Sequence, residues 1–358
     1  MSQKYFIENS QLALVAKRIL YGVLNWGLGH ASRSSVIIDY LLSQGAEVVI
    51  TSDGLALGWL RDKYPQLEFR ELPAYAIRYP KSGSFGLKML AQLPKIFWRS
   101  QAERRLCSEW TRSAHFDLVI SDNRLGFYSP NCPSLYLSHQ LKIHAPPFSA
   151  LASLAHRFYR QKYSATLVPD DPKVKLSGQL SEEGQAIYCG FLSHLKPFET
   201  ELKLDILVLL SGPEPQRSLL EEELLAKLPA DKNIAFVRGA KSLKPKTSHA
   251  KLKFYEQVNS AELSELMRAT ELVICRSGYS SLMDLYQLRK KALLIPTPQQ
   301  GEQEYLAQHL APRFLSQKQG AIDLSSESLK QALAYPGFSN VADVKDDLLS
   351  LALRPFLG

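Results

Sequence analysis

The chain has 358 residues, of which 45% are hydrophobic and 22% are charged. This is the composition of a folded globular protein of about two domains, and it excludes disordered, collagen-like and coiled-coil classes. The net charge of +8 lies in the first half: residues 1–170 contain 20 Lys and Arg against 12 Asp and Glu, whereas residues 171–358 contain 23 of each. An anionic partner is therefore expected for the first half, such as nucleic acid, a membrane surface or an acidic substrate.

Residues 1–16 are expected to form a loose leader. Their apolar run Leu12–Ala16 is too short for the core of a signal peptide, and Lys17-Arg18 follow it instead of a cleavage site. No apolar run approaches the roughly 18 residues of a membrane-spanning helix. The four cysteines are scattered, which excludes a disulfide framework and a cysteine zinc site and fits a reducing compartment. A cytoplasmic protein is therefore expected.

Short β-branched runs alternate with helical patterns along the first half. Strands are expected at Arg18–Leu24, Ala46–Thr51, Phe116–Ser121 and Ser134–Leu137, and a helix around Val36–Leu42. Such runs, separated by helices, are typical of parallel βαβ units whose sheet is covered on both faces.

A break begins at Pro169 and continues to Pro197, after which a second series starts. Its expected strands are Leu204–Leu210, Asn233–Val237, Lys253–Tyr255, Leu272–Cys275 and Ala292–Ile295, and its helices are Ala261–Ala269, Ser280–Leu288 and a closing helix at 341–356. The sequence therefore predicts two tandem doubly wound α/β domains joined by a linker.

The first motif, Asn25-Trp26-Gly27-Leu28-Gly29-His30-Ala31-Ser32-Arg33, directly follows the first strand. Its glycines allow a ligand to approach the backbone, and the next helix points its amino terminus at that ligand. A dinucleotide fingerprint would need a third glycine where Ser32 stands. His30 is either a general base near neutral pH or a structural, helix-capping histidine.

The second motif, Cys275-Arg276-Ser277-Gly278-Tyr279-Ser280, also follows a strand and opens a helix. Its N–H groups, hydroxyls and arginine could bind a diphosphate. Asp284, two turns further along, could accept hydrogen bonds from ribose hydroxyls, or be a solvated aspartate.

The third motif, Pro296-Thr297-Pro298-Gln299-Gln300-Gly301-Glu302-Gln303, forms a loop at the carboxyl end of a strand, where open α/β sheets bind ligands. Gln299, Gln300 and Gln303 offer neutral donors and acceptors for sugar hydroxyls. A polar loop without function is the alternative.

The second and third motifs together resemble the donor-binding half of glycosyltransferase family 28, whose best-known members are the MurG-type N-acetylglucosaminyltransferases of peptidoglycan synthesis. The segment G-x-G-H-A-S-R is more similar to a group of bacterial and archaeal glycosyltransferase-like proteins with the same signature. The likeness covers about Arg18 to Leu310. It implies the GT-B fold, in which two Rossmann-like parallel-sheet domains face a cleft.

The resemblance also implies a division of the chain. An acceptor domain would span 17–185 and a nucleotide-sugar domain 186–340, and a helix at 341–358 would cross back to the first domain. The expected donor-binding residues are Ser211, Gly212, Arg276, Ser277, Gly278, Tyr279, Ser280, Asp284, Gln299, Gln300 and Gln303. Gly27, Gly29, Arg33 and His139 are assigned to the acceptor side. Family members usually have Glu where Asp284 stands.

The implied reaction moves a hexosyl or N-acetylhexosaminyl group from a nucleotide sugar, usually a UDP-sugar, with inversion. His30 is the expected base, with Asp122 as a second candidate; His139 and His144 follow the next strand at the same sheet edge. No convincing D-x-D motif is present, so neither a metal nor another cofactor is expected. The loop N-W-G-L-G-H departs from the G-G-T-G-G-H of the peptidoglycan enzymes, which argues against their lipid-linked muramyl peptide as acceptor.

Residues 76–112 combine eight basic residues with apolar and aromatic ones, and only Glu103 and Glu109 oppose them. A basic amphipathic stretch is typical of a membrane surface, and equally of a helix with a core face and a solvated basic face. Pro94 is expected to divide it into two short helices. The resemblance favours a lipid-linked or glycan acceptor in cell-envelope synthesis, with peripheral docking on the inner face of the cytoplasmic membrane.

Three other functions stay open. One is a UDP-sugar 2-epimerase on the same fold, although its set of acid and base residues is not evident here. Another is a non-catalytic sugar-nucleotide or polysaccharide-binding protein. An NAD oxidoreductase is disfavoured by the missing third glycine. Nucleic acid is disfavoured as a partner because no recognition helix, zinc finger or RNP-type pattern is present.

Overall fold

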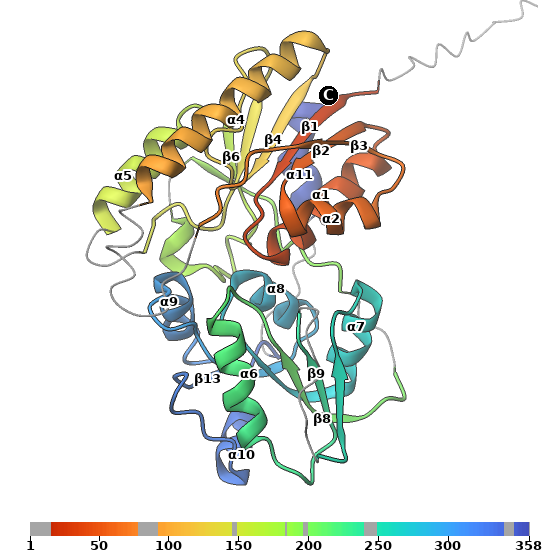
Figure 1. Ribbon diagram of the computed structural model, residues 1–358, viewed down its shortest axis with the longest axis vertical. Helices are drawn as coiled ribbons and strands as arrows, with labels where there is room; N and C mark the ends of the chain where they lie inside the picture. Colours follow the sequence, from red (N-terminus) through yellow and green to blue (C-terminus); the bar gives the residue numbers. More distant parts are fainter. Residues whose placement is uncertain are drawn as a thin grey trace, which may run out of the picture.

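The computed structural model describes residues 16–77, 92–144, 149–182, 185–195, 200–239, 249–339 and 347–357. They form two α/β domains, one above the other in Figure 1. The first sheet contains β1 (Arg18–Val23), β2 (Glu47–Ser52), β3 (Glu68–Glu71), β4 (Leu118–Asp122), β5 (Ser134–Leu137), β6 (Ala165–Val168) and β7 (Ala186–Tyr188), in the order β3-β2-β1-β4-β5-β6-β7. Helices α1 (Leu28–Ser43), α2 (Gly54–Lys63), α4 (Leu93–Ser113) and α5 (Ser149–Arg160) and a short η1 (Gly178–Ser181) accompany it.

The second sheet has the order β10-β9-β8-β11-β12-β13. Its strands are β8 (Leu204–Leu209), β9 (Ile234–Val237), β10 (Leu252–Tyr255), β11 (Thr270–Cys275), β12 (Lys291–Leu294) and β13 (Leu315–Ser316). Its helices are α6 (Gln216–Lys227), α7 (Ser260–Ala269), α8 (Tyr279–Gln287), α9 (Gly301–His309) and α10 (Ser326–Ala334), and α11 (Leu348–Leu357) ends the chain. Each pairing between described strands is parallel, which confirms the doubly wound fold of each domain.

The boundary expected at residue 185 is wrong. Strand β7 pairs with β6 through Thr166 and Ala186, so it is an edge strand of the first sheet. The first domain therefore extends at least to Tyr188. The sequence did not reveal this because Ala186–Tyr188 is three residues long and only half-buried, too short for a periodic pattern.

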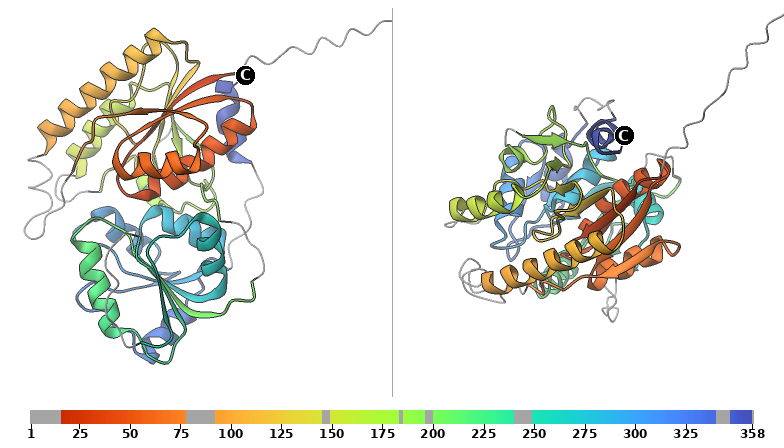
Figure 2. Two further views of the ribbon diagram at one scale, coloured as in Figure 1. Left: turned by 45° about the vertical axis from the view of Figure 1, so that its right-hand side comes forward. Right: turned by 90° about the horizontal axis from the view of Figure 1, so that it is seen from above.

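The closing helix packs on the first domain as the resemblance implies. Helix α11 contacts β7, and a Cβ added at Gly190 would lie 3.4 Å from Leu348 Cβ. Both views in Figure 2 place this dark blue helix beside the first domain. Residues 1–15 of the expected leader and residues 341–346 of the expected closing helix lie outside the described residues.

The expected interruption at Pro94 is also wrong for the described part of the basic stretch. Helix α4 is one 21-residue helix, and Pro94 lies in its first turn. A proline is tolerated there because the first N–H groups of a helix have no intrahelical partner. Residues 78–91 lie outside the described part. Pro94 therefore begins a helix and does not divide one.

The two domains share apolar packing. One cluster of buried side chains includes Tyr21 and Ile120 of the first sheet, Leu192 of the linker, and Tyr279 and Met283 of α8. Helix α1 contacts α8 directly. Burial of this surface holds the carboxyl ends of the two sheets against each other, and the expected site residues come from those ends.

Candidate active site

The loop after β1 is held rigidly at the entrance of α1. Asn25 Nδ2 donates to Asp53 Oδ1 at 2.9 Å, and Asn25 Oδ1 accepts from the N–H of Ala56 at 3.2 Å. Gly27 then caps α1 with a φ of 80°, a left-handed conformation that favours glycine. These contacts fix the direction in which α1 projects its first turn, which carries His30.

His30 contacts the buried carboxylate at the end of β4. Its Nδ1 lies 2.8 Å from Oδ1 of Asp122, and its side chain is 13% exposed. An ionised carboxylate only accepts hydrogen bonds, so Nδ1 carries the proton in this contact and Nε2 carries the lone pair. Burial, and then the charge of Arg33, lower the pKa of His30 below its ordinary 6.5. The ring is therefore neutral at pH 7 and able to accept a proton.

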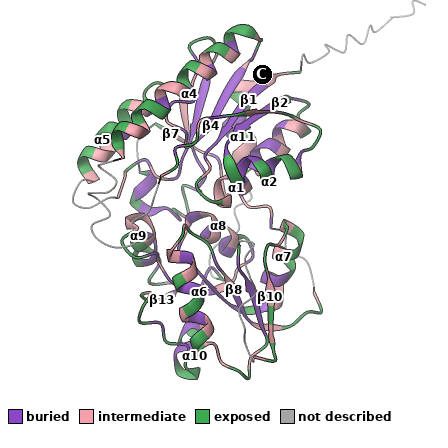
Figure 3. Cartoon of the chain, in the orientation of Figure 1, coloured by how far each residue is buried: buried purple, intermediate pink, exposed green. Residues whose placement is uncertain are grey.

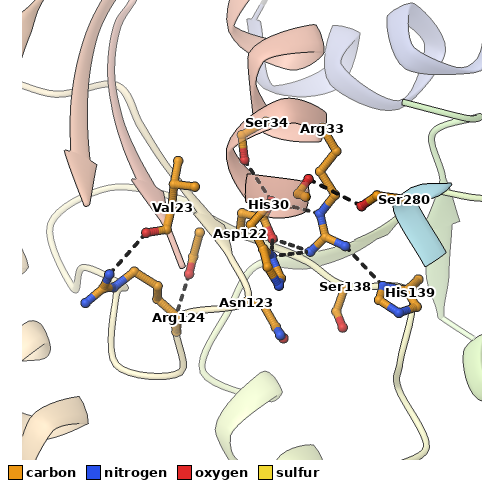
Figure 4. Close-up of polar contacts among 12 residues, drawn as sticks. Val23, His30, Arg33, Ser34, Asp122, Asn123, Arg124, Ser138, His139 and Ser280 are labelled. Carbon is orange, nitrogen blue, oxygen red and sulfur yellow. Dashed lines mark hydrogen bonds and ion pairs between the residues drawn. The ribbon is translucent and has the colours of Figure 1, made fainter. Parts of the chain in front are cut away.

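Asp122 is fully occupied by donors (Figure 4). Its Oδ2 accepts from Arg33 Nε at 2.9 Å and from Ser34 Oγ at 2.7 Å, and its Oδ1 accepts from Arg33 Nη2. Burial alone would raise the pKa of Asp122, but Arg33 and His30 more than offset it and hold that pKa well below its ordinary value. Asp122 thus orients His30 and is a poor base itself. Ser34 was missed by the sequence motifs, although it lies one turn after His30.

Arg33, assigned from sequence to the acceptor side, does not face an acceptor. Its side chain is 2% exposed and paired with Asp122. Its Nη1 lies 3.1 Å from His139 Nδ1, and its Nη2 lies 3.0 Å from His30 Nδ1. The buried guanidinium of Arg33 therefore contacts three side chains of the site: Asp122, His139 and His30.

The turn after β11 is likewise built from buried groups. Arg276 and Ser277 are both 0% exposed. The Nη atoms of Arg276 donate to the carbonyl oxygens of Ile295, Pro296 and Gln216 and to the amide oxygen of Gln319. Burial lowers the pKa of Arg276 to about 10. Arg276 was expected to contact a diphosphate. It instead holds three segments of the chain together, and its positive charge is buried beneath the turn.

Gly278 leaves open space at the amino terminus of α8. A Cβ added there would meet nothing within 4 Å, and Gly278 has an ordinary φ of −72°. Arg276 Nε and Thr297 Oγ1 are buried atoms without a hydrogen-bond partner among the described residues. Gly212, which follows Ser211 after β8, faces the same Thr297 Oγ1, since its added Cβ would lie 3.8 Å away. Ser211 and Gly212 are exposed and follow β8, and Gly278 follows β11, the strand paired with β8. The two turns and the N–H groups at the start of α8 therefore lie at the same edge of the sheet.

Two residues assigned to donor binding form contacts between the domains instead. Ser280 Oγ donates to the carbonyl oxygen of Gly29 at 3.3 Å, and a Cβ at Gly29 would lie 2.8 Å from that Oγ. Tyr279 is buried, and its hydroxyl donates to the carbonyl oxygen of Pro169 at 2.8 Å. Glycine at position 29 thus permits the close approach of α1 and α8.

Asp284 faces the linker between the domains. Its Oδ1 accepts from Ser193 Oγ at 2.5 Å. Burial raises the pKa of Asp284 to about 7, and the Ser193 hydrogen bond opposes this shift. Asp284 therefore changes charge near neutral pH.

The glutamine loop is shaped by its own side chains. Gln300 Oε1 accepts from the N–H of Gln303 at 2.6 Å and caps α9, and Gln303 Oε1 accepts from the N–H of Thr297 at 2.9 Å. Gln299 has a φ of 63° and donates its N–H to Glu304 at 2.9 Å. These oxygens hold the loop, and the side-chain N–H groups of Gln300 and Gln303, which take no part in these two contacts, could donate to a ligand.

Glu302 is the site residue that the sequence motifs did not single out. Its Oε1 lies 2.8 Å from His139 Nε2, so a residue of the second domain contacts one after β5 of the first. His139 also stacks on Tyr279, with ring centroids 4.1 Å apart and planes 2° apart. His144 lies beside this contact, because a Cβ at Gly301 would meet its carbonyl oxygen at 2.4 Å. The sequence did show a glutamate within the glutamine loop. Its partner, His139, could not be predicted, because the contact depends on how the two domains pack against each other.

Family models match both halves of the chain. Residues 217–335 match the glycosyltransferase family 28 C-terminal domain, and residues 17–125 match a model described as glycosyl transferase family 1. The first match contains Arg276, Asp284 and Glu302, and the second contains His30 and Asp122. No curated protein matches the sequence.

Solved glycosyltransferases share the arrangement of both domains. The calicheamicin glycosyltransferase CalG4 is 11% identical with a TM-score of 0.65, over 96% of this chain and 94% of its own. The spinosyn rhamnosyltransferase SpnG, in complex with thymidine diphosphate, is 15% identical with a TM-score of 0.57, over 95% of each chain. MurG from Acinetobacter baumannii is 14% identical with a TM-score of 0.51, over 88% and 89%. At these identities the likeness establishes the fold.

Proposed function

Since the chain is a family 28-like glycosyltransferase of the GT-B fold, we propose that it transfers a hexosyl or N-acetylhexosaminyl group from a nucleotide sugar to a lipid-linked or glycan acceptor. The observation that carries this proposal is the position of His30. Its Nδ1 is bound to buried Asp122, and its helix meets the amino terminus of α8 at the Gly29–Ser280 contact. A base from one domain thus lies beside an anion-binding turn of the other.

In the proposed reaction, the acceptor hydroxyl gives its proton to His30 Nε2 and its oxygen bonds to the anomeric carbon. The bond from that carbon to the diphosphate oxygen breaks, and the diphosphate leaves with the electron pair. A single displacement of this kind inverts the anomeric centre. The charge that develops on the diphosphate would be stabilised by the α8 amino terminus and by buried Arg276. We propose that these groups act without a metal.

We propose that the turn around Gly278 binds the diphosphate and that Asp284 binds the ribose. UDP is the nucleotide that we propose; the thymidine diphosphate in SpnG makes TDP the second to test. Isothermal titration calorimetry should show micromolar binding of one of them. An added Cβ at Gly278 meets no protein atom within 4 Å, so Gly278→Val fits the fold. Its side chain would occupy the space in which the diphosphate is proposed to lie, and binding should weaken at least about 10-fold.

The matched control is Gly58→Val on α2, where an added Cβ is equally unobstructed and binding should not change. Failure of every nucleoside diphosphate to bind would contradict the proposal. Nucleotide release that depends on added acceptor then separates a transferase from a 2-epimerase, whose turnover needs no acceptor, and from a protein that only binds.

We propose that the acceptor is presented by a membrane surface. Helices α4 and α5 lie on the same side of the first domain (Figures 1 and 3). Both expose large apolar side chains, each 48–67% exposed: Leu93, Phe97 and Trp98 of α4, and Leu151, Leu154 and Phe158 of α5. The core face of α4 is formed instead by Ser100, Glu103, Cys107 and Thr111. The same helices and the residues that follow them carry exposed cations: Arg99, Arg104 and Arg105 on α4, Arg157 on α5, and Lys162 just after α5.

Exposed apolar side chains and cations on the same helices suit an anionic bilayer surface. Each basic residue would contribute about 1 kcal/mol near anionic lipid, giving the peripheral inner-face association expected from residues 76–112. Among the described helices, none is long and apolar enough to cross a membrane. Part of the basic stretch, including Arg78, Lys81 and Lys88, lies outside the described residues.

The variant Leu154→Ser/Phe158→Ser should lose at least half of its sedimentation with vesicles rich in phosphatidylglycerol at low salt, because it removes two apolar contacts. The control is Leu219→Ser on α6, an exposed leucine of the second domain, which should sediment like the unmodified protein. If the unmodified protein does not sediment at low salt, the membrane surface is not its partner.

A further inference from the structure

Arg124 is a buried cation that takes no part in the proposed reaction. It comes two residues after Asp122, and its side chain is 0% exposed. Figure 4 shows it on the opposite side of Asp122 from Arg33, with its guanidinium next to Val23. A buried charge is costly unless it is paired and hydrogen-bonded, so the partners of Arg124 indicate its role.

Three of these partners lie at the carboxyl ends of neighbouring strands. Arg124 Nη1 donates to the carbonyl oxygen of Val23, at the end of β1, at 3.1 Å and to Oδ2 of Asp53, after β2, at 2.8 Å. Its Nη2 donates to the carbonyl oxygen of Pro73, after β3, at 3.0 Å. Arg124 itself follows β4, and the sheet order is β3-β2-β1-β4. One guanidinium thus joins the carboxyl ends of four adjacent strands.

Glu103 of α4 is the fourth partner. Arg124 Nε donates to Glu103 Oε1 at 2.5 Å. The hydroxyl of Tyr75 and the N–H of Gly126 donate to Glu103 Oε2 at 2.6 and 3.3 Å. The guanidinium therefore has four acceptors, two of which are buried carboxylates. A lysine, with one ammonium group on a flexible stem, cannot reach all four.

The contact with Arg124 changes how α2 is capped. Asp53 is the N-cap of α2, where an aspartate usually accepts from the N–H of the second or third helical residue, but its side chain makes no such bond. Its Oδ2 is bonded to Arg124 and its Oδ1 to Asn25 Nδ2, at 2.9 Å. The N–H of Ala56, the third residue of α2, donates instead to Asn25 Oδ1 at 3.2 Å. Asn25 therefore caps α2 from another loop, because the Asp53 carboxylate is already occupied.

The first turn of α1 lacks a cap of its own. Its N-cap is a glycine without a side-chain hydrogen bond, and its first turn contains no acidic residue, so two usual stabilisers of a helix start are missing. The loop before it is attached at Val23 and at Asn25. Arg124 maintains both attachments, directly at the Val23 carbonyl oxygen and through Asp53 at Asn25. His30, the third residue of α1, therefore depends on the path of this loop.

We propose that Arg124 is a positioning residue for His30. By holding the Val23 carbonyl and the Asp53 carboxylate, it fixes the loop before α1. The loop in turn keeps His30 Nδ1 on Asp122, the contact that leaves Nε2 able to accept a proton. This inference rests on the proposed function of His30 as the base. A displacement of about 1 Å at a reacting group can cost about 10²-fold in rate, so the position of this loop affects turnover.

Two variants detach the loop in different ways. Arg124→Lys keeps a positive charge, but its ammonium cannot reach all four acceptors, and Asp53 becomes free to cap α2 in place of Asn25. Asn25→Ala removes the attachment to α2 and leaves every buried charge in place. The matched control is Arg18→Lys at the other end of β1, where Arg18 also pairs with two carboxylates.

Nitrogen-15 spectra of the histidine rings at neutral pH test the inference without a ligand. The His30 signals, identified by their absence from His30→Ala, should show the ring protonated on Nδ1 in the unmodified chain and in Arg18→Lys. In Arg124→Lys and Asn25→Ala they should show a mixture of both neutral tautomers, because Nδ1 is no longer held on Asp122. An unchanged tautomer in Asn25→Ala overturns the proposal, even if Arg124→Lys does not fold.

Turnover gives a second readout. Initial rates of UDP release are measured with UDP-glucose and with UDP-N-acetylglucosamine, and water takes the place of the acceptor hydroxyl. In Arg124→Lys and Asn25→Ala, kcat should fall by about 10- to 100-fold, while the Kd of UDP stays within about 3-fold because the donor turn lies in the other domain. Because both variants act on one loop, the double variant should be within about 3-fold of the slower single variant. Arg18→Lys should leave kcat and Kd unchanged.

The proposal is overturned if Asn25→Ala retains the kcat of the unmodified protein, if the two losses multiply in the double variant, or if the loss of kcat is matched by a loss of UDP affinity. Rates are compared at equal folded fraction, because Arg124→Lys also weakens the pairing of buried carboxylates. If neither donor releases UDP, the proposed reaction with these donors fails, and the tautomer of His30 decides the inference alone.

Discussion

Replacing His30 with alanine is expected to lower the turnover of sugar transfer by about 10²- to 10⁴-fold, the contribution of a positioned general base, and to leave nucleotide affinity unchanged. The variant removes the ring whose Nδ1 is held by Asp122. It leaves intact the turn around Gly278, which belongs to the other domain. Initial rates of nucleotide release at saturating acceptor, together with calorimetric nucleotide binding, check both halves of the expectation.

The control for this variant is His115→Ala, since the His115 side chain is 85% exposed and its loss should not change the rate. The pH dependence gives a second check. A base must be neutral to act, and the pKa of His30 is lowered from 6.5, so kcat/KM should hold its plateau through pH 7 and fall by half only below pH 6.5. Unchanged turnover in His30→Ala would show that His30 is not the base.

Asp122→Asn is expected to lower turnover by a comparable factor, about 10²- to 10⁴-fold. An asparagine amide can donate to His30 Nδ1, which would place the ring proton on Nε2, and it removes the charge that stabilises the imidazolium after proton transfer. Because Asp122 acts through His30, the double variant His30→Ala/Asp122→Asn should be no slower than His30→Ala alone. Rates are measured as for His30→Ala.

A double variant slower by a further 100-fold or so would instead identify Asp122 as a base in its own right, the second candidate from the sequence. Asp122→Asn also leaves the buried charge of Arg33 without its partner, and the free energy of unfolding should fall by about 3–5 kcal/mol. Turnover is therefore compared at equal folded fraction, measured by denaturant unfolding. By contrast, Ser34→Ala removes only one neutral donor to Asp122 and should lower the free energy of unfolding by much less.

The two largest expected effects both concern residues that the sequence had singled out, and this has a physical reason. His30 follows a glycine-containing turn at a strand end, and Asp122 ends a strand of buried apolar residues. In a parallel sheet the carboxyl ends of neighbouring strands lie at one edge, and β1 pairs with β4. Local sequence patterns were therefore sufficient to predict that His30 and Asp122 lie at the same edge of the sheet.

The sequence misjudged residues whose environment is made by distant segments. Arg33 and Arg276 were expected to face ligands, but both are buried and bonded to protein oxygens. Tyr279 was expected at the donor, and it stacks on His139 of the other domain. A sequence motif does not show whether its arginine side chain points to solvent or into the protein, because the packing of distant segments decides that direction.

By itself the sequence determined the two α/β domains and the positions of the turns, because strand burial, glycine turns and helix starts are local properties of the chain. The glycosyltransferase class followed from the resemblance of its motifs to a known family. Only the tertiary structure decided that Asp122 is buried against His30, Arg33 and Ser34, that the first sheet continues to Tyr188, and that Glu302 meets His139. Each of these depends on contacts between residues far apart in sequence (Glu302 and His139 are in different domains), and the free energy of such contacts is set by the burial and charge that folding brings about.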